Sequence, residues 1–100
     1  MLNTSANIIQ TDAGELLLSG SLNFVTAVEL QKKGEALIDQ QGAQCVIDLS
    51  AVTDSSSVGV ALLTVWLRFA KERKKVLRYQ GIPKTMLDMV NLSGLDTLLI

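Results

Sequence analysis

Short apolar runs alternate with longer segments of helical periodicity along this chain, and that order limits its fold more than any other feature. Residues 7–10 ("NIIQ") and 15–19 ("ELLLS") are short apolar runs separated by the turn-forming sequence "TDAG". They predict a β-hairpin. The segment Val25–Gln41 carries apolar residues at helical spacing and stops at Gly42, which predicts a helix.

The rest of the chain continues the alternation. Gln44–Leu49 is apolar without alternation, the pattern of a strand covered on both faces or central in a sheet. We predict a second helix over about Ser56–Lys74 and a strand over Val76–Gly81. A third helix should begin at Pro83, because proline suits the first helical turn. The last residues, "SGLDTLLI" (93–100), suggest one more short apolar element.

The order β-β-α-β-α-β-α predicts a single α/β domain over residues 1–100. Strands that alternate with helices imply right-handed crossovers and a largely parallel sheet, to which the hairpin adds an antiparallel strand. We expect a mixed sheet of four to five strands with three to four helices. A chain of 100 residues is long enough for one core and too short for two.

Composition excludes several classes of function. The chain has no histidine, which removes Ser-His and Cys-His nucleophilic pairs and the commonest metal ligand. One cysteine and scattered carboxylates argue against a zinc site. The net charge of -1 gives no electrostatic footprint for nucleic acid. We therefore expect no enzymatic activity, no metal, no cofactor and no nucleic-acid partner.

Cysteine usage and hydropathy indicate the compartment. Cys45 has no second cysteine with which to form an intramolecular disulfide. The opening residues lack the basic start and long apolar stretch of a secretory signal, and no run of about 18 apolar residues occurs. We expect a reducing, cytoplasmic location and no direct membrane span.

The predicted second helix is more apolar than a surface helix requires. One face, expected to cover the sheet, holds Val58, Leu62, Val65 and Phe69. An adjoining stripe holds Gly59, Val60, Leu63, Leu67 and Ala70, with Trp66 at its edge. Either neighbouring helices cover this stripe or it forms a partner surface. In the first helix, Gly34 lowers helix propensity and is expected to let a neighbour approach closely.

Three consecutive serines follow the central strand in "SAVTDSSS" (residues 50–57), which we expect to be a loop at the carboxyl end of a parallel strand. Asp54 or Ser55 can cap the next helix, but capping needs only one such residue. No histidine is present to activate a serine, and the glycines and lysine of a phosphate-binding loop are missing. Docking or regulation by phosphorylation therefore remains.

The stretch "IDLSAVTDSSSVGVALL" resembles the STAS domain family, shared by sulphate transporters and bacterial anti-sigma factor antagonists. In that family a strand and "DLS" precede Asp-Ser-Ser-Gly-x-Gly at the start of a helix. The corresponding residues here are Asp54, Ser55, Ser56, Ser57, Val58 and Gly59. The likeness extends over nearly the whole chain, from "LLLSGSLNFVTAVEL" to "GIPKTMLDMVNLSGLDTLL". It implies the anti-sigma factor antagonist-like fold and a protein-interaction module that is not an enzyme.

The resemblance fits two branches of the family. In anti-sigma factor antagonists the second serine of the pattern, here Ser56, is phosphorylated by a serine kinase that is also the anti-sigma factor. Here Ser57 replaces the usual glycine. The other branch is the cytoplasmic STAS subunit of the lipid-asymmetry (Mla) ABC transporter of Gram-negative bacteria, which binds the transporter's ATPase. In that branch the residue after the aspartate, here Ser55, lies at the contact.

The sequence resembles the transporter branch more closely, in "LSGSLNF", in Trp66 and in "SGLDTLL". That resemblance implies phospholipid transport, an ABC transporter ATPase as partner and a position peripheral to the inner membrane. The alternative is a phosphorylation-regulated anti-sigma factor antagonist. The expected contact residues are Asp54, Ser55, Ser56 and Ser57, together with Asn23 and Phe24. The sequence leaves self-association open.

Overall fold

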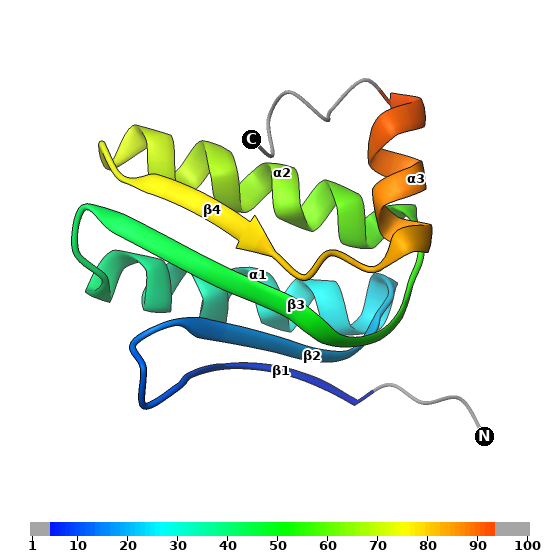
Figure 1. Ribbon diagram of the computed structural model, residues 1–100, viewed down its shortest axis with the longest axis horizontal. Coiled ribbons are helices and arrows are strands. Elements are labelled where there is room, and N and C mark those ends of the chain that lie inside the picture. The colour runs from blue at the N-terminus through cyan, green and yellow to red at the C-terminus, as the bar shows by residue number, and fades with distance from the viewer. Residues whose placement is uncertain (1–4, 94–100) are drawn as a thin grey trace.

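The structure, a computed structural model, describes residues 5–93 and has the element order predicted from the sequence (Figure 1). The opening hairpin is β1 (Ala6–Gln10) and β2 (Leu16–Leu22). The elements that follow are α1 (Phe24–Gln40), β3 (Gln44–Ser55), α2 (Ser57–Glu72), β4 (Val76–Gln80) and α3 (Lys84–Ser93). The last apolar element that we expected, after Ser93, lies outside the described residues.

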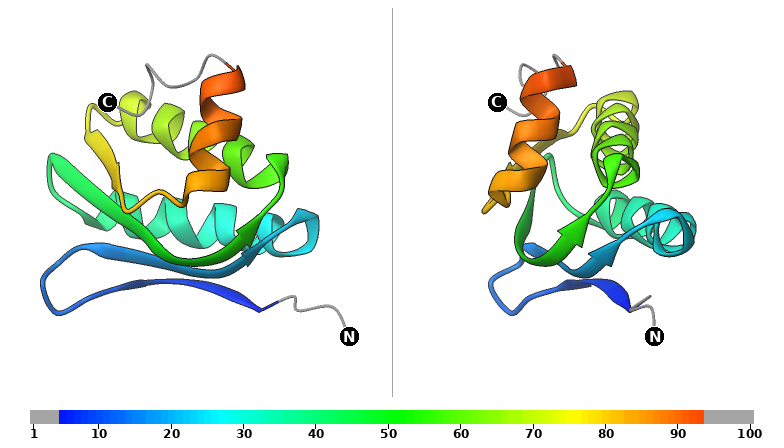
Figure 2. Two further views of the ribbon diagram at one scale, coloured as in Figure 1. Left: turned by 45° about the vertical axis from the view of Figure 1, so that its right-hand side comes forward. Right: turned by 90° about the vertical axis from the view of Figure 1, so that its right-hand side faces the viewer.

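The strands form one mixed sheet in the order β1-β2-β3-β4. β1 pairs antiparallel with β2, whereas β2 with β3 and β3 with β4 are parallel. Helices α1 and α2 cover one face of the sheet, and α3 packs against α2 (Figures 1 and 2). The predicted single small α/β architecture is confirmed. None of the described helices has the length and hydropathy needed to cross a membrane.

β3 is longer than predicted, because it continues from Leu49 to Ser55. β2 remains paired with it in this region, with Leu22 opposite Ser55 after two register shifts, each of which leaves an extra residue in β3. Val52 lies in the core, which anchors the extension. The prediction of a loop over residues 50–57 is therefore wrong, and only Ser56 separates the strand from α2.

The core is centred on Trp66 of α2, whose side chain is fully buried. Its indole lies against Gly34 of α1, where an added Cβ would overlap the ring. The indole Nε1 donates to the carbonyl oxygen of Gln31 over 3.2 Å. The close approach expected at Gly34 is thus confirmed, and it brings α1 and α2 together.

The buried face of α2 differs from the prediction. Its buried residues are Gly59, Val60, Leu62, Leu63, Trp66 and Ala70. Val58, Val65 and Phe69 are only partly buried, so of the face expected to cover the sheet Leu62 alone is buried. Two glycines determine which face of α2 is buried. Gly34 leaves space for the large side chain of Trp66, and Gly59 lets the start of the helix approach Leu22. Neighbouring elements cover most of the adjoining stripe.

Candidate partner-binding site

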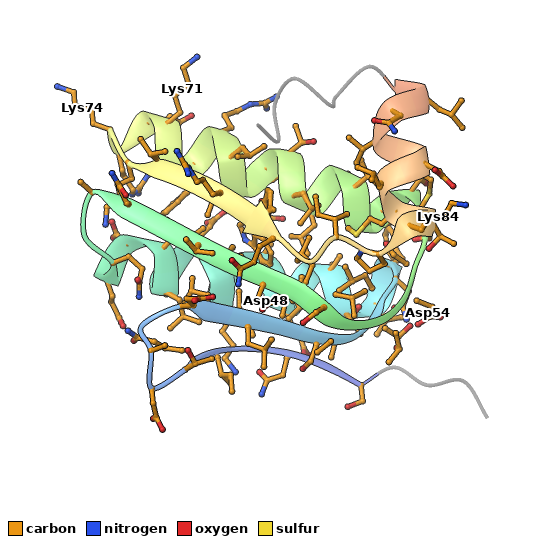
Figure 3. The ribbon with its side chains drawn as sticks, in the orientation of Figure 1. Asp48, Asp54, Lys71, Lys74 and Lys84 are labelled. Carbon is orange, nitrogen blue, oxygen red and sulfur yellow. The ribbon has the colours of Figure 1, made fainter. Side chains whose placement is uncertain are left out.

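The starts of α1 and α2 lie together at one end of the sheet, where β2 and β3 end. The Ser56 amide donates to the carbonyl oxygen of Leu22 over 3.1 Å, which ties the two strand ends together. Asp54 and Lys84 mark this end of the molecule in Figure 3, while Lys71 and Lys74 mark the opposite end. The fold therefore brings the expected contact residues of both segments to the same end.

The three serines have different environments. Ser56 caps α2, since its Oγ accepts the Val58 amide over 3.2 Å, so the prediction that Asp54 or Ser55 caps this helix is wrong. Ser55 is half-buried, its Oγ donates to the Ser56 carbonyl oxygen over 2.9 Å, and it lies against Gly59. Ser56 and Ser57 are exposed. Their hydroxyl groups, rather than that of Ser55, are therefore open to a partner.

Asp54 is exposed beside the serines. Its Oδ1 accepts a hydrogen bond from the hydroxyl group of the adjacent Thr53 over 3.3 Å. This local contact leaves the carboxylate at the surface, where it gives the start of α2 a negative charge.

At the start of α1, Asn23 stabilises the helix, whereas Phe24 lies at the surface. The Asn23 side chain caps the helix by accepting the amides of Val25 and Thr26 over 2.9 and 3.1 Å. The Thr26 hydroxyl accepts the Asn23 amide over 3.0 Å and completes a capping box. Phe24 is 76% exposed, so its ring adds little to the core. An exposed ring of this size is a candidate anchor for a partner.

An apolar groove runs between α1 and α2 and begins at this end. Its walls include Phe24, Ala27 and Val28 from α1, and Val58, Ala61 and Val65 from α2. The hollow is about 200 Å³, and Val28 on its rim is 59% exposed. We call this surface the α1–α2 groove. It contains Val58, Ala61 and Val65, which are part of the α2 apolar surface that the core leaves uncovered.

Sequence reasoning identified Phe24 but missed the rest of the α1 wall of this groove. Phe24, Val28 and Gln31 lie at i, i+4 and i+7, which places them on one helical stripe. That spacing was a usable signal, but the buried positions of α1 obscure it because they are equally apolar.

The described residues contain no group of acidic or cysteine side chains that could hold a metal ion. Cys45 is buried and distant in the fold from the starts of α1 and α2, and burial raises the pKa of its thiol. The features that this end of the molecule offers are an apolar groove, exposed hydroxyl groups and one carboxylate. Such a surface is suited to binding another protein.

A family model described as "Mlab, STAS domain" matches residues 7–100 of the sequence. A search of curated proteins found no match. The structural matches include a chain of the Acinetobacter MlaFEDB complex in an ATP-bound conformation. That chain has a TM-score of 0.77 and 27% sequence identity, and the match covers 89% of this chain and 94% of the other.

Two further matches are anti-sigma factor antagonists. One, from Mycobacterium paratuberculosis, has a TM-score of 0.68 and 25% identity, with 93% of this chain and 80% of that one covered. The other is SpoIIAA in its unphosphorylated form, with a TM-score of 0.73, 14% identity, and 96% and 86% of the two chains covered. The second likeness concerns the fold alone.

Proposed function

This chain belongs to the STAS domain family, and we propose that it is a non-enzymatic protein-interaction module. The observation that carries the proposal is the α1–α2 groove, an exposed apolar surface that opens beside the hydroxyl groups of Ser56 and Ser57. Contiguous exposed apolar surface marks association sites on proteins. The proposed contact surface consists of the groove, whose α1 wall includes Phe24, and the exposed residues Asp54, Ser56 and Ser57.

The proposed partner is the ATPase subunit of an Mla-type phospholipid ABC transporter. The likeness to a chain of the Acinetobacter MlaFEDB complex supports this choice, since it extends over nearly the full length of both chains. In this role the protein is cytoplasmic and lies at the inner membrane through the transporter complex. It acts as an accessory subunit and supplies no catalytic group.

The physical basis of binding is desolvation of the groove. A helix or loop of the ATPase that places apolar side chains between Phe24 and Val65 removes both from water. The serine hydroxyl groups at the end of the groove then pair with polar groups at the rim of the contact, a common arrangement of interfaces. Ser55 packs against Gly59 at the start of α2 and so stabilises the helix end that carries these hydroxyl groups.

Val28→Lys tests the assignment. Val28 is 59% exposed on the groove rim, so the substitution adds a charge without opening the core. We expect the affinity for the purified cognate ATPase subunit to fall at least tenfold, about 1.4 kcal/mol, because the ammonium group must be desolvated on binding. Biolayer interferometry measures the affinity.

Val76→Lys is the matched control, because Val76 is 54% exposed on β4, at the start of that strand. The groove begins where β2 and β3 end, so the control adds the same charge away from it. Equal affinities of the two variants for the ATPase would contradict the assignment of the groove.

The second candidate is an anti-sigma factor antagonist regulated by phosphorylation of Ser56. It is favoured by the position of Ser56, which is exposed at the start of α2 and beside the groove. A phosphate there would carry about -1.5 to -2 charges, which the helix dipole stabilises. The same charge would have to be desolvated in any contact that covers the groove.

Two measurements separate the candidates. Ser56→Asp keeps a capping side chain while adding charge, so it changes the contact more than the helix. A phosphorylation switch predicts that Ser56→Asp abolishes binding to the kinase and that Ser56→Ala binds constitutively. A transporter subunit predicts unphosphorylated protein by intact-mass spectrometry from its native host, and this is the outcome we expect because Ser57 departs from the kinase-type pattern.

A further inference from the structure

β1 is an edge strand of the described sheet, and its outer edge has a defined pattern of backbone groups. The Thr11 amide donates to Glu15, and the Ser21 amide donates to Ser5, so odd-numbered residues of this strand face β2. The backbone N–H and C=O groups of Ala6, Ile8 and Gln10 therefore point away from the sheet. Such a row is a template for another strand.

The sequence of the strand itself lacks two common protections of an exposed edge. Its sequence, "ANIIQ", contains no charged residue and no proline, both of which commonly prevent edge pairing. Ile9 is 45% exposed on the face of the sheet that the helices leave open. These features favour strand pairing.

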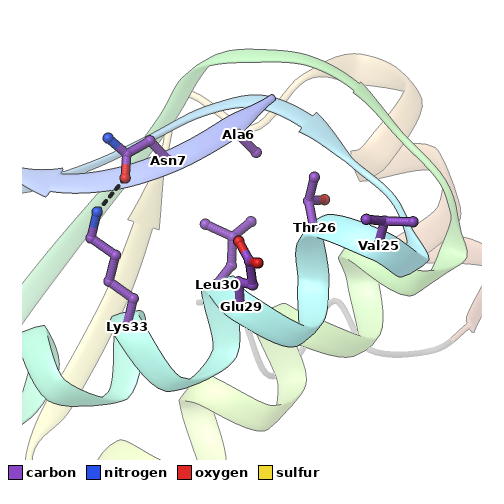
Figure 4. A pocket seen from close by; sticks show the side chains of 7 residues that line it. All are labelled: Ala6, Asn7, Val25, Thr26, Glu29, Leu30 and Lys33. Atoms are coloured by element: carbon purple, nitrogen blue, oxygen red, sulfur yellow. Dashed lines mark hydrogen bonds between the residues drawn. The ribbon is translucent and has the colours of Figure 1, made fainter. Parts of the chain in front are cut away.

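One contact occupies the centre of this edge. The Asn7 side-chain Oδ1 accepts the amide of Ile8 over 2.9 Å, in the place that the carbonyl group of an added strand would take. Lys33 of α1 donates to the same oxygen through its Nζ (Figure 4). We call this arrangement the Asn7–Lys33 clasp. It covers Ile8 but neither Ala6 nor Gln10.

We infer that β1 pairs antiparallel with β1 of a second copy of this chain, and that the Asn7–Lys33 clasp competes with this pairing. A two-fold axis at Ile8 places Ala6 opposite Gln10 of the second copy and Ile8 opposite its equivalent. All three outward-facing residues of each strand then pair at once. The result is one continuous sheet through both copies.

The cleft beside the edge fits this register. Between β1 and α1 lies a hollow of about 250 Å³ next to Ala6, shown in Figure 4. The small side chain of Ala6 leaves room there for the long side chain opposite it, which is Gln10 of the second copy. The carboxylate of Glu29 and the ammonium group of Lys33 line the cleft. These two groups complement both ends of a carboxamide, whereas the Thr26 hydroxyl beside them is held by Ser21 and Asn23.

The strength of the pairing follows from its size. A five-residue strand makes a contact smaller than the roughly 1,200 Å² of a stable interface, so the dimer should be weak and concentration-dependent. Opening the clasp releases the Ile8 amide and the Lys33 ammonium group for the second copy. The clasp therefore sets the concentration at which copies pair.

Sedimentation velocity of the purified chain over a range of concentrations tests the inference. We expect Asn7→Ala, which removes the competitor, to lower the dimer dissociation constant at least threefold. Gln10→Pro removes an outward N–H without breaking a bond between β1 and β2, so it should raise the constant at least tenfold. Gln10→Ala is its matched control, because it keeps the N–H and should weaken pairing less. A monomer at every concentration in both the wild type and Asn7→Ala would overturn the inference.

Disulfide trapping tests the register. The proposed pairing places Asn7 opposite Ile9 of the second copy, as a non-hydrogen-bonded pair with closely spaced Cα atoms. A mixture of Asn7→Cys and Ile9→Cys chains should form mixed disulfides faster than either variant alone, while wild-type chains, whose Cys45 is buried, should form none.

A comparison of Val28→Lys with Gln10→Pro shows which of the two surfaces mediates self-association. Self-association that Val28→Lys abolishes and Gln10→Pro leaves unchanged would run through the α1–α2 groove and would overturn the pairing of β1.

Discussion

Tyr79 of β4 links the sheet to α2 through a single buried hydrogen bond. Its hydroxyl group donates to the carbonyl oxygen of Leu63 over 2.7 Å. Burial raises the pKa of the Tyr79 phenol well above its usual range. Since the neutral form is the one that fits the core, the free energy of unfolding is coupled to the protonation of this residue.

The sign of that coupling gives a prediction at alkaline pH. The unfolded chain releases the phenol proton near pH 10, whereas the folded chain keeps it to higher pH. The stabilisation is present below about pH 10 and is lost as pH rises, by up to about 1.4 kcal/mol per pH unit. Urea unfolding should show Tyr79→Phe about 1 kcal/mol less stable at pH 7. The variant should lose less stability than the wild type above pH 10, and parallel losses would contradict the role of Tyr79.

The packing of Gly34 against Trp66 permits no larger residue at this position without rearrangement. Alanine there would gain roughly 1 kcal/mol of helix propensity, but its Cβ would overlap the buried indole of Trp66. We expect Gly34→Ala to lower the free energy of unfolding by about 1–3 kcal/mol, as overpacking does. Gly42→Ala is the control, because no atom lies within 4 Å of a Cβ at Gly42. Equal unfolding midpoints of the two variants would show that the α1–α2 contact adapts to the added methyl.

The elements themselves were largely predictable from local patterns. The hairpin, three helices and β4 follow from apolar spacing and from turn and stop residues such as Gly42. The extension of β3 was not predictable, because it depends on pairing with the end of β2, which lies distant in the sequence. The buried face of α2 was also ambiguous, since Val58 and Val65 are as apolar as Leu63. Only the fit of Trp66 against Gly34 decides between the two faces.

The candidate site was likewise predictable only in part. Its position at the ends of β2 and β3 follows from the topology, and the sequence pointed to Phe24 and the serines. The capping residue of α2 was misassigned, because the true end of β3 determines which serine starts the helix. The groove needed the relative placement of α1 and α2, which no local pattern contains.

Capping of α2 gives a prediction at the level of this element. Ser56→Ala removes the Oγ that accepts the Val58 amide, and we expect a loss of about 1 kcal/mol in the free energy of unfolding. Ser57→Ala should be nearly neutral for stability, because Ser57 is exposed in the first turn and caps nothing among the described contacts. Urea denaturation compares them. Equal losses would indicate that the helix begins elsewhere.

At the level of the whole molecule, the two proposed binding surfaces lie on different elements. The α1–α2 groove uses the side of α1 that faces α2, whereas the β1 edge adjoins the cleft formed with Glu29 and Lys33. The helix α1 thus separates the surfaces. A chain paired through β1 keeps its groove open to the proposed ATPase partner, so the two kinds of binding do not compete.

This arrangement predicts independent effects of substitutions at the two surfaces. Val28→Lys should weaken binding to the ATPase at least tenfold and leave the dimer dissociation constant within about twofold of wild type. Gln10→Pro should do the reverse, and the double variant should combine the two losses without further change, because the sites share no contact. Sedimentation velocity with and without the ATPase measures both constants in one series. Loss of ATPase binding in the Gln10→Pro chain would contradict the independence of the two surfaces. It would show either that the ATPase binds the paired form selectively or that the β1 edge belongs to the contact with the ATPase.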